Sequence, residues 1–224
     1  MPGGSIITSS PLGERYRTLD IVPAELELDD TELELGATIF GDPTESTWKK
    51  LTLLSQWIAD NGIDDLYDYI IFDCPPATKL VTRNAIACSH GYVIPIIPDD
   101  VSSRGMPHLV NFLSGRIDPA LSALADDIRR RGKYVINTFC SSTQLTALLV
   151  AMIQKHGPAY SGYTDAHTRN LRLLQSDPLW CGYLAEPYIE IGEGVRRALS
   201  RSRTVYDSSD DPNIRNRNYI NVYR

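Results

Sequence analysis

A carboxylate at the end of an apolar run is the group in this sequence best placed to bind a ligand. Residues 67–72 (Tyr-Asp-Tyr-Ile-Ile-Phe) lead into Asp73, and Cys74-Pro75-Pro76 follows. A short apolar run is typical of a strand buried on both faces of a parallel sheet, and prolines cannot continue its hydrogen-bonded ladder. Asp73 therefore falls at the carboxyl edge of a predicted strand, where open α/β sheets bind their ligands. The structural alternative is an aspartate that caps the turn after the strand.

Two further apolar runs predict two more strands. Residues 92–97 end at Pro98-Asp99, and residues 134–136 end at Asn137. Helical segments are expected between and beside these strands, at residues 82–88, 107–113 and 121–131. Alternation of strands and helices is the pattern of a doubly wound domain. We expect an α/β fold with a mostly parallel sheet flanked by helices.

The rest of the chain supplies the other expected elements. Pro43, beside acidic residues, marks a helix start, and Asn61-Gly62 marks its end. One apolar face of this helix is expected to pack on the sheet, through Trp48, Leu51, Leu54 and Ile58. The remaining elements are a strand at 17–23, a loop at 98–104, a helix at 145–156, a polar segment at 160–177, a strand at 179–184 and a helix at 189–199. Residues 24–35 alternate acid and leucine in a way that suits either a helix or a strand.

Length and composition favour a single domain with a sizeable core. The chain has 224 residues, of which 42% are hydrophobic. We expect an irregular segment at 1–17 that includes a candidate short strand at 5–8, an α/β domain at 18–206, and a polar tail at 207–224. A secretory signal pattern and a stretch of membrane-spanning length are both absent from the sequence. These features predict a cytoplasmic protein without a membrane partner.

Charges and cysteines exclude some classes of function. A net charge of −6 argues against a surface coated throughout by nucleic acid. The charge is uneven, because residues 25–45 hold eight acids and no Lys or Arg, whereas residues 196–224 hold seven arginines and three aspartates. The four cysteines form no C-x-x-C pair, so we expect reduced, buried thiols rather than disulfides or a zinc site.

Several motifs together resemble the ParA/Soj/MinD family of P-loop ATPases. The first is Asp68-Tyr69-Ile70-Ile71-Phe72-Asp73-Cys74-Pro75-Pro76, which is similar to the family's Walker B region. It is followed by Thr82-x-Asn84-Ala85 and then by Val93-Ile94-Pro95. Upstream, Leu19-Asp20-Ile21-Val22-Pro23-Ala24 resembles a family strand that precedes an acidic helix. The resemblance implies that residues 24–35 form this helix, with Leu26, Leu33 and Ile39 inward, and that the polar residues 160–177 are an insertion relative to the family. The resemblance covers residues 18–155 and continues weakly to residue 206.

The resemblance implies a nucleotide site built from loops after the strands. Asp73 would hold Mg²⁺, usually through water, beside bound ATP. Residues 74–78, including Pro75, would form the switch region that senses the γ-phosphate. Asn137 matches a position from which the family contacts the adenine base, and its alternative role is an Asx turn that closes a strand.

The phosphate-binding loop of that family is missing from the sequence. Its pattern, K-G-G-x-G-K-[ST], gathers backbone N–H groups and a lysine around phosphate. Neither Gly3-Gly4-Ser5 nor Gly13-Glu14-Arg15 matches it, so we expect a fold without the first strand and P-loop and assign no catalytic residue. The resulting gap in the sheet would be filled by residues 5–8, by a second chain, or by different pairing of the remaining strands.

Two functions remain open from the sequence. The first is a ParA-like partition or positioning protein that forms a homo-oligomer around ATP, binds DNA non-specifically and responds to a partition-partner protein. Its candidate DNA-binding residues are Arg196, Arg197, Arg201 and Arg203, although Glu190 and Glu193 lie nearby and a solvated helix face is the alternative. The second is a non-catalytic scaffold or regulatory subunit that pairs with a complete ATPase. An unrelated hydrolase on the same architecture has only fold analogy in its favour.

Overall fold

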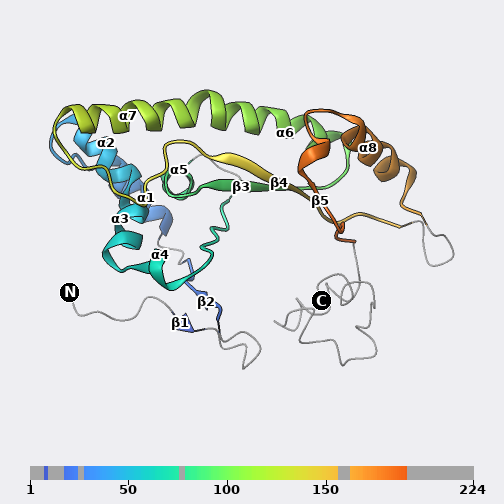
Figure 1. The fold of residues 1–224 in the computed structure, drawn as a ribbon, viewed down its shortest axis with the longest axis horizontal. Coiled ribbons are helices and arrows are strands. Elements are labelled where there is room, and N and C mark those ends of the chain that lie inside the picture. The colour runs from blue at the N-terminus through green and yellow to red at the C-terminus, as the bar shows by residue number, and fades with distance from the viewer. Residues whose placement is uncertain (1–7, 10–17, 25–27, 76–78, 156–161, 191–224) are drawn as a thin grey trace.

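A parallel sheet lies at the centre of the computed structural model, which describes residues 8–9, 18–24, 28–75, 79–155 and 162–190 (Figure 1). The elements follow in the order β1 (Thr8–Ser9), β2 (Asp20–Ile21), α1 (Leu28–Ala37), α2 (Pro43–Leu51), α3 (Leu53–Asp60), α4 (Ile63–Leu66), α5 (Leu80–Ala87), β3 (Gly91–Ile96), α6 (Asp100–Phe112), a π-helical segment (Leu113–Ile117), α7 (Asp118–Arg130), β4 (Gln144–Val150), α8 (Asp165–Ser176), a 3₁₀ turn (Cys181–Tyr183) and β5 (Leu184–Ala185). The expected α/β class, with helices flanking a parallel sheet, is confirmed.

Within the described part of the chain, the sheet has the strand order β3-β4-β5 and all of its pairs are parallel. Strand β3 runs beside β4 from Gly91 opposite Gln144 to Ile96 opposite Val150. Branched side chains of both strands are buried with Met106 of α6 and with two leucines of α8, in a cluster that comprises Ile94, Ile96, Met106, Leu148, Val150, Ile153, Leu171 and Leu174. Burial of these side chains joins α6 and α8 to the sheet.

One continuous helix crosses the molecule beside the sheet, as Figure 1 shows for α6, the π-helical segment and α7. Its start is fixed by Asp99, whose carboxylate accepts a hydrogen bond from the Ser102 N–H at 2.7 Å. The helix contributes to all three buried clusters: Met106 to the cluster on the sheet, Leu113, Ile117 and Leu121 to a second cluster with Ala87, and Ala125 and Ile128 to a third with Trp48.

The expected apolar face of the helix that starts at Pro43 is confirmed, but its packing partner differs. Trp48 and Ile58 are buried, and Thr52 divides the segment into α2 and α3. Trp48 packs against Phe139, with ring centroids 4.8 Å apart, and against Ala125 and Ile128 of α7. The face therefore packs on a helix and not on the sheet.

The side chain of Asn84, from the Thr82-x-Asn84-Ala85 motif, hydrogen-bonds the backbone on both sides of the break between α2 and α3. Its Oδ1 accepts from the Leu54 N–H at 3.2 Å, and its Nδ2 donates to the carbonyls of Lys50 at 2.8 Å and Leu80 at 3.0 Å. The side chain is buried, and it pairs backbone groups that the helix break would otherwise leave unsatisfied.

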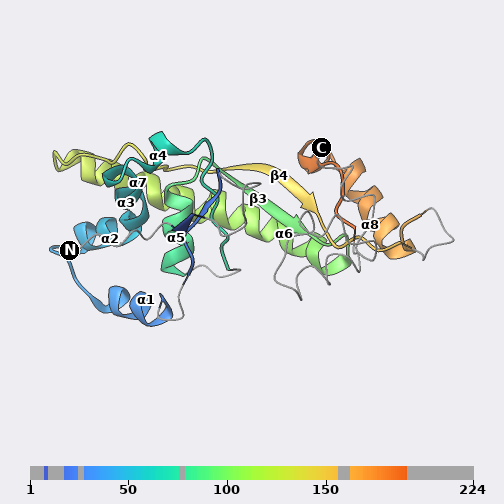
Figure 2. The ribbon, with the colours of Figure 1, turned by 90° about the horizontal axis from the view of Figure 1, so that it is seen from below.

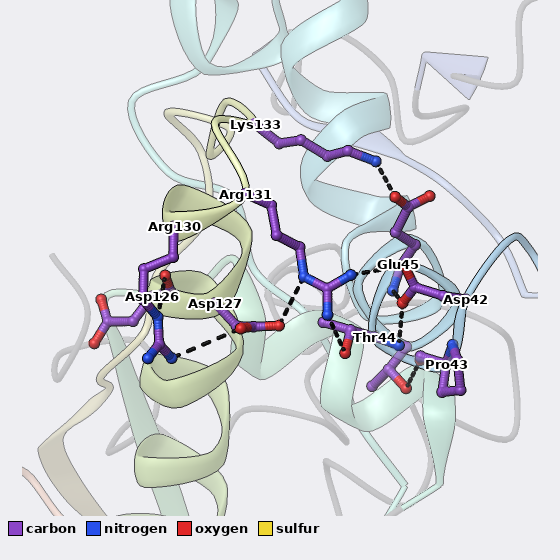
Figure 3. A network of polar contacts seen from close by, with 10 residues as sticks. Asp42, Pro43, Thr44, Glu45, Asp126, Asp127, Arg130, Arg131 and Lys133 are labelled. Carbon is purple, nitrogen blue, oxygen red and sulfur yellow. Dashed lines mark hydrogen bonds and ion pairs between the residues drawn. The ribbon is translucent and has the colours of Figure 1, made fainter.

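A polar network joins the start of α2 to the end of α7 (Figure 3). The Asp42 carboxylate caps α2 by accepting from the N–H groups of Thr44 at 2.9 Å and Glu45 at 3.1 Å. The Arg131 guanidinium bonds Asp42 at 2.6 Å and Asp127 at 2.9 Å, and Lys133 pairs with Glu45. Hydrogen bonds from the Glu45 and Thr44 backbone and the charge of Arg131 hold the pKa of Asp42 below its usual value.

Two predicted strands are absent from the structure. Residues 67–73 and 134–137 form neither strand nor helix. Tyr69 and Ile71 are 85% and 87% exposed, and Tyr134 is 70% exposed, which contradicts burial between two faces. A strand needs neighbours to pair with, and no strand in the described ranges pairs with these residues. Thr8, which ends the candidate strand at 5–8, pairs with Ile21 of β2 and does not fill a gap beside β3.

Several other expected elements are corrected. The predicted helix at 145–156 is wrong, since this stretch contains most of the strand β4. A short apolar run suits a buried strand as well as a buried helix. Most of the expected loop at 98–104 belongs to α6, which begins at Asp100. The expected insertion at 160–177 contains α8. In place of the expected strand at 179–184, the structure has a 3₁₀ turn followed by the two-residue strand β5. In α1 and after it, Leu33 and Ile39 are 74% and 76% exposed and not inward. Leu26, most of the helix at 189–199 and the tail at 207–224 lie outside the described residues.

Removing the Asn84 side chain should destabilise the fold. In Asn84→Ala the Leu54 N–H and the Lys50 carbonyl lose their buried partner, so we expect the free energy of unfolding to fall by about 2–4 kcal/mol. Urea denaturation followed by circular dichroism measures this change. Asn111→Ala, at an exposed position of α6, is the matched control and should change the value little. Equal effects of both substitutions would contradict the role given to Asn84.

The cap at Asp42 predicts a pH dependence of stability. Because the folded pKa is lowered, the stabilisation is present above the unfolded value of about 3.9 and is lost as pH falls through the folded pKa. Asp42→Asn retains a capping oxygen but not the charge. Wild type should therefore melt at a higher temperature than Asp42→Asn above about pH 4, with the difference shrinking in stronger acid. A difference that stays constant from neutral pH into strong acid would contradict this assignment; Asp68→Asn controls for losing one exposed carboxylate.

Candidate functional site

The Asp73 carboxylate lies on an exposed loop between α4 and α5. Asp73, Cys74 and Pro75 are all exposed, and residues 76–78, the rest of the expected switch region, are outside the described ranges. Within those ranges, there is no cluster of three or more His, Cys, Asp or Glu side chains that could hold a metal ion. Mg²⁺ is usually bound by one or two carboxylates together with waters and the phosphates of a substrate. Asp73 therefore fits the role of a Mg²⁺ ligand only where waters and nucleotide phosphates supply the other ligands.

Asn137 lies in the turn after residues 134–136, and its Oδ1 accepts a hydrogen bond from the Tyr134 hydroxyl. Together with its neighbours it lines an open cavity of about 430 Å³, whose wall comprises Arg129, Lys133, Tyr134, Val135, Ile136, Asn137 and Phe139. Tyr134 also lines a second cavity of about 390 Å³ with Phe40, Trp48 and Lys133. An amide beside an aromatic ring and two cations can bind a planar polar ligand.

The loop after Asn137 contacts the end of α5. The Cys140 N–H donates to the Ala87 carbonyl at 2.7 Å, which brings the loop after Asn137 to that helix end. Burial raises the pKa of the neighbouring Cys88 to about 12, and the thiols of Cys140 and Cys74 add to this shift.

The start of α5, just after the switch region, is held by an acid from α1. Glu32 Oε1 accepts from the Val81 N–H at 2.8 Å, and Glu32 Oε2 lies 3.9 Å from Lys79 Nζ. A carboxylate at a helix start satisfies a free N–H and interacts favourably with the helix dipole. The sequence predictions missed Glu32, Lys79 and Tyr134. For Glu32 the available signal was its place in the acid-rich helix that precedes the Walker B region in the family pattern.

The expected cysteine environment is partly wrong. The four cysteines are free thiols, but Cys74 and Cys181 are exposed, whereas Cys88 and Cys140 are half-buried. Burial raises the pKa of Cys140, and burial together with the charge of Asp73 raises the pKa of Cys74. The candidate DNA-binding arginines, Arg196, Arg197, Arg201 and Arg203, lie outside the described residues.

The AAA domain family matches residues 5–123, which is more than half of the chain. This chain belongs to that family, in its ParA/MinD-type branch. The match includes the Walker B-like motif around Asp73, and the resemblance read from the sequence is confirmed.

Two curated relatives identify the branch. The chain is 36% identical over 93 residues to the sporulation initiation inhibitor protein Soj of Bacillus subtilis, covering 42% of this chain and 32% of Soj. It is 27% identical over 106 residues to the chromosome partitioning protein ParA of Caulobacter vibrioides, covering 46% of this chain and 36% of that protein. The chain thus spans about a third of the length of each of these relatives.

Solved structures of McdA share the fold. The apo form gives a TM-score of 0.55 at 12% identity, covering 87% of this chain and 63% of McdA. The complex of a single-residue variant of Cyanothece McdA with ATP gives a TM-score of 0.57 at 13% identity, covering 87% of this chain and 62% of McdA. These similarities confirm a fold of the P-loop ATPase type.

The thiol environments predict selective alkylation. With a pKa of about 12, only about one Cys88 thiol in ten thousand is ionised at pH 8, whereas Cys181 is exposed. Brief treatment of the native chain with iodoacetamide at pH 8, read by peptide mass spectrometry, should label Cys181 at least about a hundredfold faster than Cys88. The two should react alike in urea. Equal rates in the native chain would contradict the packing at the end of α5.

Proposed function

We propose that this chain is the α/β portion of a ParA-like partition or positioning system whose nucleotide site is incomplete within residues 1–224. The observation that carries the proposal is the family match over residues 5–123, which includes the motif around Asp73. In this interpretation Asp73 holds Mg²⁺, Pro75 belongs to the switch loop, and Asn137 faces the base.

The exposed carboxylate and the cavity beside Asn137 support this assignment. Asp73 is open to solvent on a loop, so a hydrated cation can reach it. The cavity of about 430 Å³ has the size of a small-molecule site, and the Tyr134 ring and Asn137 amide suit a planar base.

Residues 1–224 lack the groups that would bind the phosphates of ATP. Phosphate binding needs converging backbone N–H groups and a lysine, which the K-G-G-x-G-K-[ST] pattern supplies and residues 1–224 do not contain. The start of α5 does not replace this loop, because Glu32 already occupies its Val81 N–H. We therefore derive no hydrolysis step for this chain.

The same mismatch favours a second function, a non-catalytic scaffold or regulatory subunit that pairs with a complete ATPase. Under either function the partners are another chain of the same kind, a partition-partner protein and, through Arg196, Arg197, Arg201 and Arg203, DNA without sequence preference. An intact phosphate cradle in an associated chain would favour the first function, and stable pairing without nucleotide would favour the second.

Calorimetry with Mg²⁺-ATP tests the incomplete site. Without a phosphate cradle, residues 1–224 should bind no tighter than a Kd of about 1 mM, and Asp73→Ala should behave alike. Asp65→Ala, at an exposed position of α4, is the matched control. A micromolar Kd that Asp73→Ala abolishes and Asp65→Ala preserves would overturn the incomplete site and establish a working nucleotide site at Asp73.

A further inference from the structure

The chain between α4 and α5 exposes apolar side chains that a folded domain normally buries. Leu66, Tyr69 and Ile71 are 68%, 85% and 87% exposed, and Ile70 is 38% exposed. We call residues 66–73 the acidic edge segment. Beyond Leu66, the last residue of α4, it forms no helix, and none of the described strands pairs with it. The Tyr67 N–H bonds the Ile63 carbonyl, and the backbone N–H and C=O groups of residues 68–73 are available to a partner.

The exposed surface continues beyond this segment onto β2. The Tyr67 hydroxyl donates to the Asp20 carboxylate, which places β2 against the segment. Ile21 and Val22 are 43% and 53% exposed there. Exposed apolar side chains on neighbouring segments of a folded protein mark an interaction surface.

The segment is also strongly acidic. Residues 51–78 contain five aspartates and no lysine or arginine: Asp60, Asp64, Asp65, Asp68 and Asp73. Of these, Asp64, Asp65, Asp68 and Asp73 are exposed on or beside the segment. A partner that buries the apolar side chains must therefore lie close to several negative charges, which favours a partner carrying lysine or arginine.

Charge argues against a second copy of this chain as the occupant. Two copies joined through this segment would bring their aspartates together, and like charges at close range are unfavourable. The sequence itself is rich in strand-forming types, with Tyr69, Ile70, Ile71 and Phe72 in succession. Unpaired backbone in such a sequence is a template for an added strand.

We propose that the acidic edge segment is a docking site for an extended, basic and apolar strand of a second polypeptide, which pairs with its backbone and covers Tyr69 and Ile71. The added strand supplies the main-chain hydrogen bonds, its alternate apolar residues cover the exposed side chains, and its lysines or arginines face the aspartates. Asp73 belongs both to this segment and to the proposed Mg²⁺-ATP site. Peptide binding is measured without nucleotide, so either proposal can fail without the other.

A designed peptide tests the proposal on the full chain of 224 residues. The probe is a fluorescent peptide of alternating valine and threonine with two lysines at each end, and its matched control has glutamate in place of every lysine. Fluorescence anisotropy should show binding of the lysine peptide at least about tenfold tighter than the glutamate peptide, with affinity falling from about 50 to about 500 mM NaCl. Hydrogen exchange should slow at residues 68–73 when the lysine peptide is bound.

Substitutions locate the peptide on the surface. Ile71→Lys adds a positive charge at an exposed position and should weaken binding of the lysine peptide at least about tenfold without unfolding the chain. Leu173→Lys makes the same change at a residue of α8 that is 60% exposed, and it should have no effect. Absence of binding, equal binding of both peptides, or equal effects of both substitutions would overturn the proposal. Self-association in sedimentation that Ile71→Lys abolishes would also overturn it and assign the surface to a second copy.

Discussion

Parallel pairing of β3 with β4 is the interaction on which the described structure depends. The two strands lie side by side from Gly91 to Ile96, and this places Ile94, Ile96, Leu148 and Val150 together in one buried cluster. A parallel pair cannot form from adjacent chain segments, so the connection between β3 and β4 must cross over, and here it does so through α6 and α7. The helices α2 and α5 pack against that crossover, and α3 lies beside α2 and α5 (Figure 2).

Elements that carry their own local signal were predictable from sequence. Asp42-Pro43 indicates the start of α2, the position between strands indicates α5, and a branched run with a proline near its end indicates β3. The prediction of a helix at β4 is wrong, because Leu145–Val150 shows no alternation and periodicity alone cannot assign such a run. Residues 67–73 have strand-forming composition, yet a strand is defined by a neighbour that the local sequence cannot report.

The residues of the candidate site were chosen by their position in the sequence, and their roles stay a prediction. Asp73 and Asn137 both follow apolar runs; Asp73 lies on the loop before α5, and Asn137 lies in the turn before Cys140, which bonds the end of α5. The contacts that shape this region come from residues far away in sequence: Glu32 at the start of α5, and Asn84 between α2 and α3. Such contacts depend on three-dimensional packing, for which a single sequence holds no spacing rule. Within the described ranges, no helix is long and apolar enough to cross a bilayer.

The continuous helix from Asp100 to Arg130 has a consequence for how the domain comes apart. Met106, Leu113 and Ile128 belong to three different buried clusters, yet they lie on one helix. A helix that loses its packing at one end loses part of the support for the next turn, because helical order is cooperative along the backbone. Loss of the sheet cluster therefore weakens the cluster around Trp48, although the two share no side chain. We therefore expect the three clusters to unfold as one cooperative unit and not as separate foldons.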